Sequence, residues 1–207
     1  MKKIKSPMIR TRDPKTTRHS ILQSSFEEIY FKGFQAASVN NIIKKTKLTK
    51  GAFFHHFKTK LDLGYAVVEE LLTALTFQIW IEPFKGDDNT ISVLEEMYLG
   101  RITAFKNAPA ILGCPLNNLS QEMSPIDDGF RERIQRVFEL WINGFAEALE
   151  NGKQAGVVSN GINSQLTAFT LISMIEGAIS IAKGTQDIKF MDQGLLSYRN
   201  YLQLLKP

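Results

Sequence analysis

SVNNIIKKTKLTKGAFFHHF, residues 38–57, predicts two short helices joined by a tight turn. Ser38 and Thr49 are good N-cap residues, and each precedes apolar residues at helical spacing. The helices should cover about 39–45 and 50–56, which leaves room for a single turn between them. This is the spacing of a helix-turn-helix, whose second helix can enter the major groove of DNA.

The charged side chains in and just after this segment are all basic, and no acidic residue interrupts them between positions 38 and 61. They are Lys44, Lys45, Lys47, Lys50, Lys58 and Lys60. An apolar interior with a uniformly basic exterior is what a phosphate-facing surface requires. The segment is therefore predicted to read DNA.

A helix over about 14–32 should complete a three-helix unit, with Asp13 as its cap, Pro14 in its first turn and Gly33 at its C-terminal end. Residues 1–12 are basic and lack periodicity. Two interpretations of them stay open. They form either a flexible arm that contacts DNA phosphates or the minor groove, or a solubilising tail.

The composition, with 43% apolar and 22% charged residues in 207, is that of an ordinary globular protein. No uninterrupted apolar run reaches the roughly 18 to 20 residues needed to cross a bilayer, so no membrane partner is expected. The basic N-terminus is not followed by the apolar stretch of a secretory signal. A single cysteine excludes an internal disulfide and fits a reducing compartment, so a cytoplasmic location is expected.

Charge is distributed unevenly along the chain. Residues 1–63 hold 14 Lys/Arg against 4 Asp/Glu, whereas residues 64–207 hold 11 against 17. A basic first third joined to an acidic remainder suggests a polyanion-binding module attached to a second unit. We therefore predict a DNA-binding domain over 1–60 and a larger helical domain over 61–207.

The remainder of the chain also predicts helices, and no strand-like alternation or repeat is present. A long helix should run from Thr59 to about Ile81 and join the two units. Further helices are expected over about 90–106, 126–150, 166–183 and 188–205, with short helical turns within 109–125. The fold class is therefore all-α, with about nine helices.

The segment 166–183 is more apolar than its neighbours, and two interpretations stay open. It is either a buried core helix or, with the last helix, half of a four-helix bundle made with a second copy of the chain. A helix-turn-helix favours the second, because such readers usually bind two half-sites as a two-fold dimer. The candidate dimerisation residues are Phe169, Ile172, Ile179, Tyr198 and Leu202.

Two sets of motifs resemble the TetR family of one-component transcriptional regulators. The N-terminal set, which is specific, consists of Gly33-Phe34, Ser38-Val39, Ile42, Thr49-Lys50-Gly51 and His56-Phe57-Lys58-Thr59-Lys60. The C-terminal set resembles the ligand-binding domain of one branch of the family, and consists of Gly113-Cys114-Pro115-Leu116, Asn118-Leu119, Glu122-Met123, Trp141 and Glu176-Gly177-Ala178.

The resemblance implies nine or ten helices, a homodimer formed through the last two, and a palindromic operator. It also implies a repressor that leaves DNA when a small molecule occupies the larger domain. By position, the implied DNA contacts are Ser38, Thr49, Lys50, Gly51, Phe54, His55 and Lys60. The basic side chain of Lys47 adds a further candidate.

Three positions depart from the family pattern. Lys47 stands where glycine is usual, so a positive φ would cost it about 1 kcal/mol. Ile43 stands where a small residue is usual, so packing must adjust there. Phe54 stands where tyrosine is usual and lacks the hydroxyl group that touches a phosphate, so a packing role is an alternative.

Cys114 precedes Pro115, a residue suited to the first position of a helix. Cys114 would then be the cap, where a helix N-terminus favours the thiolate. The residue is either a sensor of oxidants or electrophiles, or a small side chain that lines a pocket. The candidate effector-pocket residues, for each of which ordinary core packing is the alternative, are Phe105, Cys114, Met123, Trp141, Phe145 and Met174.

No catalytic constellation, phosphate-binding loop or cofactor motif is present, so neither an enzyme nor a cofactor is expected. A metal site is not expected either, because His55 and His56 point to different helix faces and His19 is distant. Two functions remain open. One is a ligand-responsive repressor. The other is an effector-independent DNA-binding adaptor or nucleoid-associated protein, which a sealed core without a cavity would favour.

Overall fold

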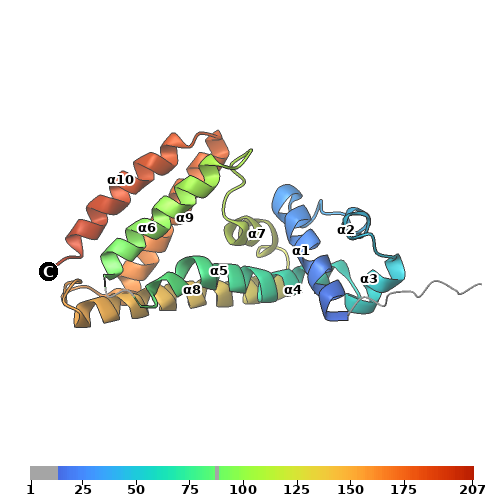
Figure 1. Cartoon of the computed structure of the whole chain (residues 1–207), viewed down its shortest axis with the longest axis horizontal. Helices are drawn as coiled ribbons and strands as arrows, with labels where there is room; N and C mark the ends of the chain where they lie inside the picture. Colours follow the sequence, from blue (N-terminus) through green and yellow to red (C-terminus); the bar gives the residue numbers. More distant parts are fainter. Residues whose placement is uncertain (1–13, 87–88) are drawn as a thin grey trace, which may run out of the picture.

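The computed structural model describes residues 14–86 and 89–207, and every regular element in these ranges is a helix (Figure 1). The all-α prediction is confirmed. The basic arm and the Asp13 cap lie outside the described residues. The elements are α1 Pro14–Lys32, α2 Val39–Thr46, α3 Lys50–His56, α4 Lys60–Ala66, η1 Val67–Leu72, α5 Thr73–Trp80, η2 Glu82–Phe84, α6 Thr90–Lys106, α7 Pro115–Met123, α8 Asp128–Gln154, α9 Ser164–Thr185 and α10 Lys189–Leu204.

The turn between α2 and α3 is built by two local devices. Lys47 has φ 55° and ψ 33°, so the left-handed conformation expected at this position is present. The side chain of Thr49 accepts a hydrogen bond from the backbone N–H of Ala52 and so begins α3. Ser38 precedes α2 in an extended conformation, but its side chain makes no cap hydrogen bond.

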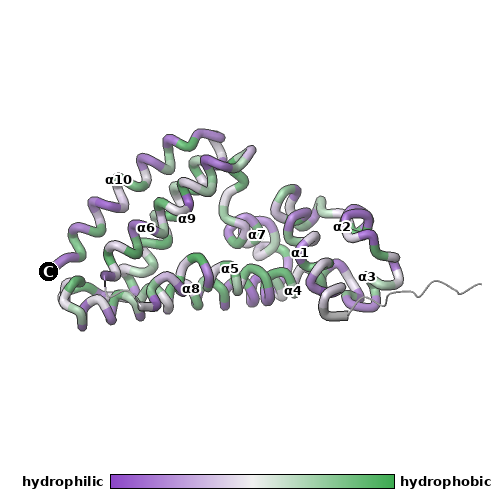
Figure 2. Tube along the Cα trace, in the orientation of Figure 1, coloured by the Kyte–Doolittle hydropathy of each residue, from purple (hydrophilic) through white to green (hydrophobic). Residues whose placement is uncertain are grey.

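The joining helix extends as predicted but is not regular. Thr59 and Asp62 form a capping box at its start. The next segment, Val67–Leu72, is a π-helix, and the hydroxyl group of Thr73 donates to the carbonyl oxygen of Val68 at 3.1 Å. Such π segments in α-helices occur frequently at functional sites. Figure 2 shows that the run through α5 is hydrophobic along much of its length.

The larger part of the chain is built on α8, which runs beside α5 and packs on α9 (Figure 1). α10 packs on α9 and α6. The sequence prediction ended α8 at Glu150 because Asn151-Gly152 follows, but the helix continues to Gln154. Gly152 is needed there for close packing, since a Cβ would lie 2.6 Å from Val158 and 2.8 Å from Thr90.

Buried side chains form two hydrophobic cores. The N-terminal core joins α1–α3 to α4, η1, α7 and the first half of α8, and the C-terminal core joins α5, α6, α8, α9 and α10. Cys114 and Phe138 are partly buried and pack against both cores. Because the N-terminal core crosses position 60, the DNA-binding unit shares a core with the start of the larger unit.

By length and composition alone, the helix Ser164–Thr185 is long and apolar enough to cross a membrane. The search for uninterrupted apolar runs did not find it, because polar residues interrupt the segment. Half of its most apolar window is buried inside the protein. It packs between α8 and α10. The C-terminal core therefore explains the buried half of its apolar side chains, while Leu166, Phe169 and Ile181 remain exposed.

Candidate functional site

The helix-turn-helix presents most of the predicted DNA-contacting residues to solvent. The exposed ones are Lys47, Thr49, Lys50, Gly51, Phe54 and His55. The Phe54 ring is 46% exposed and touches Phe53 edge-on, so it is available at the surface as well as partly packed. Ser38 and Lys60 are half-buried.

Lys60 is engaged within the protein. Its ammonium group donates to the carbonyl oxygen of Gln35 at 2.9 Å and lies 4.9 Å from the centre of the Phe34 ring. Partial burial lowers the pKa of Lys60. The side chain thus ties the start of α4 to the segment between α1 and α2, a role that the sequence did not reveal.

Gly51 lies on open surface near the start of α3. A Cβ built on it would meet only the hydroxyl oxygen of Thr49, at 3.9 Å. The fold therefore does not require glycine here. A surface without a side chain at this position allows the backbone of α3 to approach a partner closely.

A buried carboxylate holds α2 against α1. The carboxylate oxygens of Glu28 lie 2.8 Å from the Lys32 ammonium group and 3.4 Å from that of Lys45. The carboxylate also accepts a hydrogen bond from the side-chain amide of Asn41 at 3.0 Å. These interactions, that with Lys32 foremost, lower the pKa of Glu28 to about 2. The sequence analysis did not identify this cluster, although an acidic residue followed four residues later by a lysine is a recognisable signal of an ion pair in a helix.

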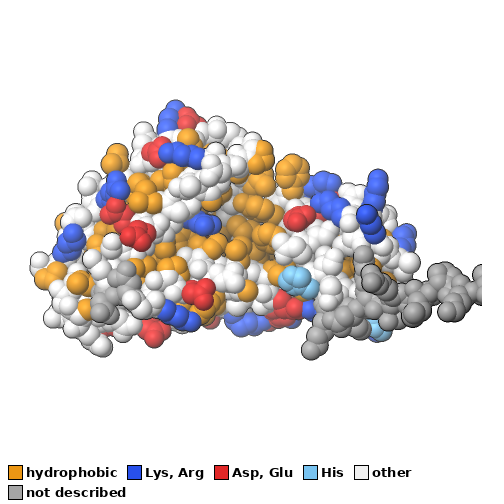
Figure 3. All heavy atoms as spheres, viewed as in Figure 1, with side chains coloured by type: hydrophobic (Ala, Val, Ile, Leu, Met, Phe, Trp, Pro, Cys, Tyr) orange, Lys and Arg blue, Asp and Glu red, His pale blue; other side chains and the backbone are white. Residues whose placement is uncertain are grey.

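A cavity of about 350 Å³ opens between α1, α5, α6, α7 and α9. Figure 3 shows hydrophobic side chains gathered in a hollow at the middle of this face, and Lys and Arg side chains around α2. Of the six candidate pocket residues, the cavity is lined by Phe105, Cys114 and Trp141. Met123 lies in the N-terminal core and Phe145 in the C-terminal core, against which Met174 also packs.

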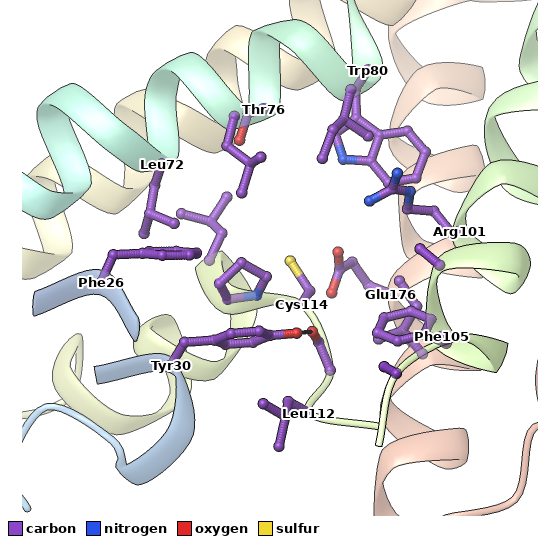
Figure 4. A pocket seen from close by; sticks show the side chains of 18 of the residues that line it. Phe26, Tyr30, Leu72, Thr76, Trp80, Arg101, Phe105, Leu112, Cys114 and Glu176 are labelled. Atoms are coloured by element: carbon purple, nitrogen blue, oxygen red, sulfur yellow. Dashed lines mark hydrogen bonds between the residues drawn. The ribbon is translucent and has the colours of Figure 1, made fainter. Parts of the chain in front are cut away.

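Polar groups gather on one wall of the cavity, where Figure 4 shows the Cys114 sulfur beside the Glu176 carboxyl group, with Arg101 beyond. Burial raises the pKa of Glu176, and polar contacts with Cys114 and Asn117 offset only part of this shift. Burial and the Glu176 carboxylate raise the pKa of the Cys114 thiol well above its usual value. Cys114 caps α7 as expected, but its surroundings disfavour the thiolate that the sequence suggested.

The first helix contributes to the cavity, which the sequence did not indicate. Phe26, Tyr30 and Phe31 of α1 line it. The hydroxyl group of Tyr30 donates to the carbonyl oxygen of Gly113 at 2.6 Å (Figure 4). Burial raises the pKa of Tyr30 to about 12. A contact between positions 83 residues apart has no local sequence signal.

α7 connects the cavity to the DNA-binding unit. Cys114 lies at its start, and Glu122 near its end accepts hydrogen bonds from the backbone N–H groups of Phe34 and Gln35 at 2.7 and 2.8 Å. Gly33 comes so close that a Cβ on it would lie 2.9 Å from the Glu122 carboxylate. A second cavity of about 340 Å³ separates α1 from α7 beside these contacts.

Most of the candidate dimerisation residues lie inside the protomer. Ile172 and Ile179 of α9 and Tyr198 and Leu202 of α10 are at most 6% exposed and belong to the C-terminal core. Phe169 is 59% exposed. The apolar side chains that α9 and α10 do present to solvent are Leu166, Phe169, Ile181, Leu196 and Leu204.

His55 and His56 lie side by side with ring centres 5.3 Å apart. Burial and the neighbouring His55 lower the pKa of His56. Within residues 14–86 and 89–207, no three side chains of His, Cys, Asp or Glu gather as a metal site would require.

Comparison with known proteins agrees with this architecture. Residues 21–67 match the model of bacterial regulatory proteins of the tetR family, and residues 92–196 match the tetracyclin repressor-like C-terminal domain. The transcriptional repressor DhaR of Mycobacterium sp. (strain GP1) is 25% identical over 86% of this chain and 88% of its own. The transcriptional regulator AcuR of Cereibacter sphaeroides is 27% identical over 83% and 78%.

Solved structures share the fold. The reduced form of NemR from Escherichia coli superposes with a TM-score of 0.81 at 23% identity, covering 89% of this chain and 96% of that one. A TetR-family regulator from Cytophaga hutchinsonii has a TM-score of 0.81 at 21% identity, with 95% and 98% covered. The family match spans both the helix-turn-helix and the larger helical unit. The chain therefore belongs to the TetR family of transcriptional regulators.

Proposed function

We propose that this protein is a cytoplasmic repressor that binds a palindromic operator as a homodimer and is released by a small molecule bound in the 350 Å³ cavity. One observation carries the proposal. The cavity is walled partly by α1, the first helix of the DNA-binding unit, and partly by α5, α6, α7 and α9 of the larger unit. A ligand there contacts both units at once.

Release follows from geometry. Two recognition helices that enter successive major grooves must be about 34 Å apart. Because α1 shares the N-terminal core with α2 and α3, a shift of α1 moves α3 with it. A displacement of a few ångströms then separates one α3 of the dimer from its half-site. The π-helical segment between α4 and α5 provides a place where this change can be absorbed.

We propose that the eight predicted residues supply the DNA contacts in different ways. The exposed start of α3, with Thr49, Lys50 and Gly51, supports contacts to phosphates and bases. Lys47 and His55 add exposed polar groups beside it. Phe54 can contact DNA through the exposed part of its side chain. Ser38 and Lys60 are better placed to orient the unit than to reach far into a groove.

The proposed dimer face consists of α9 and α10. Leu166, Phe169 and Ile181 expose more than half of their surface on α9, and a Cβ at Gly177 would meet nothing within 4 Å. Apolar side chains around an open glycine allow close helix packing between two copies. Sedimentation of Phe169→Glu should show monomers, whereas Ile126→Glu, at an exposed apolar site outside these helices, should leave the dimer intact.

An effector-independent adaptor would be favoured by a sealed core. The core of this protein contains a cavity, so that function is not favoured. The deciding experiment is a genomic footprint of the purified protein followed by a release screen with small molecules. Sequence-specific binding that a small molecule reverses supports the proposal. Binding to random DNA as tight as to the footprint would reject it.

A further inference from the structure

The cavity wall contains a guanidinium group without a counter-ion. Arg101 of α6 lies 5.9 Å from the centre of the Trp80 ring. No carboxylate lies within ion-pair distance of it in the part of the chain that the structure describes. Its Nε atom is buried and has no hydrogen-bond partner. Arg101 is half-buried, and a partly desolvated cation without a counter-ion is costly, so this wall favours a partner of negative charge.

Two other residues that line the cavity bring buried polar atoms to it. The indole nitrogen of Trp141 is buried without an acceptor, and the buried carboxyl oxygens of Glu176 have only the contacts with Cys114 and Asn117. Buried polar groups in native proteins are rarely left without partners. Three such residues around a single cavity indicate a ligand with a polar end.

The charges of the groups that line the wall determine which charge the polar end of the ligand should carry. Its titratable groups are Tyr30, Arg101, Cys114 and Glu176. Burial raises the pKa of the phenol, the thiol and the carboxyl group, which favours the neutral form of each. Arginine stays protonated in proteins even where burial lowers its pKa, as it does here. Of the charges on this wall, the positive charge of Arg101 is therefore the most firmly kept.

The opposite side of the cavity is apolar. Figure 4 shows Phe26 and Leu72 facing Arg101 and Glu176 across the open space. The lining of the cavity as a whole is dominated by aromatic and aliphatic side chains. A volume of about 350 Å³ lies at the small end of the range for ligand sites. The site therefore suits a compact molecule with an apolar body.

We propose that the effector is an apolar monocarboxylic acid, which binds with its carboxylate at Arg101 and its body against Phe26 and Leu72. The inference rests on the proposed function only in calling this ligand an effector. A carboxylate accepts hydrogen bonds from Arg101 and Trp141, and from Glu176 in its protonated form. Binding is non-covalent, and Cys114 lines the cavity without acting as a nucleophile.

Other ligand charges fit this wall less well. An organic cation would meet the positive charge of Arg101 in a setting of low dielectric constant. A neutral molecule would leave the partly desolvated guanidinium group without a counter-ion. An oxyanion accepts hydrogen bonds from the donors of the wall and also balances the charge of Arg101.

The test is a set of matched probes titrated calorimetrically into the full-length protein without DNA. Phenylacetate, 3-phenylpropionate, 4-phenylbutyrate and octanoate are each compared with the corresponding primary amide and primary amine. We expect at least one acid to bind about tenfold or more tightly than its amide, since a charge-assisted hydrogen bond contributes on that scale. The amines should bind more weakly than the amides.

Arg101→Gln should lose this preference, while the affinity for the amide changes little. Arg101→Lys, which keeps the charge, should restore part of it and covers the case in which the glutamine variant folds poorly. The matched control is Arg136→Gln, an exposed arginine of α8 outside the cavity. If no acid binds better than its amide, or if Arg101→Gln keeps the preference, the inference is wrong.

The outcome separates the inference from the proposed function. Acids that bind through Arg101 without releasing operator DNA would support the ligand class and reject the effector-controlled repressor. Release by amides or amines through the cavity, with no preference for acids, would support the repressor and reject the ligand class.

Discussion

The hydroxyl group of Tyr30 donates a hydrogen bond to the carbonyl oxygen of Gly113 at 2.6 Å. Tyr30 belongs to α1, and Gly113 immediately precedes Cys114 on the cavity wall. The bond therefore joins the first helix of the DNA-binding unit to the segment that a ligand would touch. Glu122 provides a second link at the other end of α7.

Tyr30→Phe should weaken the coupling between cavity and DNA. Losing the hydrogen bond should lower the free energy of unfolding by about 1 kcal/mol, because the Gly113 carbonyl oxygen loses its partner. The ligand-induced loss of operator affinity should shrink as well. Urea unfolding and operator titrations with and without ligand measure the two effects.

The matched control is Tyr65→Phe, which removes a 2.9 Å hydrogen bond to Asp127 outside the cavity. It should cost comparable stability and leave ligand-induced release unchanged. If both variants respond to ligand like the wild type, the Tyr30 link has no part in release.

Lys47→Gly should stabilise the protein. Lys47 has φ 55°, a conformation that costs a residue with a side chain about 1 kcal/mol relative to glycine. If Lys47 contacts a phosphate, the slope of log affinity against log salt should also fall by about 0.9. Thermal unfolding and operator titrations at several salt concentrations measure the two effects.

Lys47→Gln separates them, because it removes the charge but keeps the strained backbone. It should change the salt slope without raising the unfolding temperature. A glycine variant that unfolds at a lower temperature than the wild type would show that the lysine side chain stabilises the turn.

Gly51→Ala should bind operator DNA more weakly while the fold is at least as stable. The open surroundings of Gly51 allow a methyl group, and alanine is favoured over glycine in a helix by up to about 1 kcal/mol. The loss of affinity follows if the backbone of α3 approaches DNA closely.

Gly100→Ala on α6 serves as the comparison, since a Cβ there meets nothing within 4 Å. It should raise stability without changing operator affinity. Undiminished binding by Gly51→Ala would mean that α3 does not approach DNA through this residue.

Much of the fold could be predicted because its signals are local. Thr49, Thr59 and Gly33 mark helix ends through their own backbone chemistry, and the structure places helix ends at all three. The π-helical segment could not be predicted, since Val67–Leu72 differs from an α-helix only in its hydrogen-bond register. Gly152 was predicted to follow the end of a helix. In the structure it lies within α8, where the close approach of Val158 and Thr90 requires a residue without a Cβ.

The site was less accessible to sequence reasoning because it depends on which face of each helix turns inward. Cys114 was identified as a pocket candidate because it is chemically unusual. Arg101 was missed, since a lone arginine on an apolar helix resembles a solvent-facing charge. Tyr198 was assigned to the dimer face, but hydrophobic character alone does not distinguish the protomer core from an interface.

Acid should weaken the junction of α1 and α2. The pKa of Glu28 is lowered from an ordinary 4.5 to about 2, so its stabilising contribution is fully present above the unfolded value. The contribution is lost progressively as the pH falls from about 4.5 through about 2. The difference in unfolding free energy between the wild type and Glu28→Gln should be constant above pH 5 and shrink below it.

Glu27→Gln, at the exposed neighbouring position, should track the wild type across the same range. A difference between the wild type and Glu28→Gln that does not change with pH would show that the ionised carboxylate is not what holds α2.

In the proposed repressor, the cavity and the DNA-binding surface are energetically coupled. Coupling is reciprocal, so a ligand that lowers operator affinity must itself bind more weakly, by the same factor, when operator is present. The measurement is the affinity of a releasing small molecule for the protein alone and for the protein saturated with its footprinted operator. We expect a weakening of about 5- to 150-fold, equal to the loss of operator affinity that the same ligand causes. An affinity for the ligand that operator DNA leaves unchanged would contradict it.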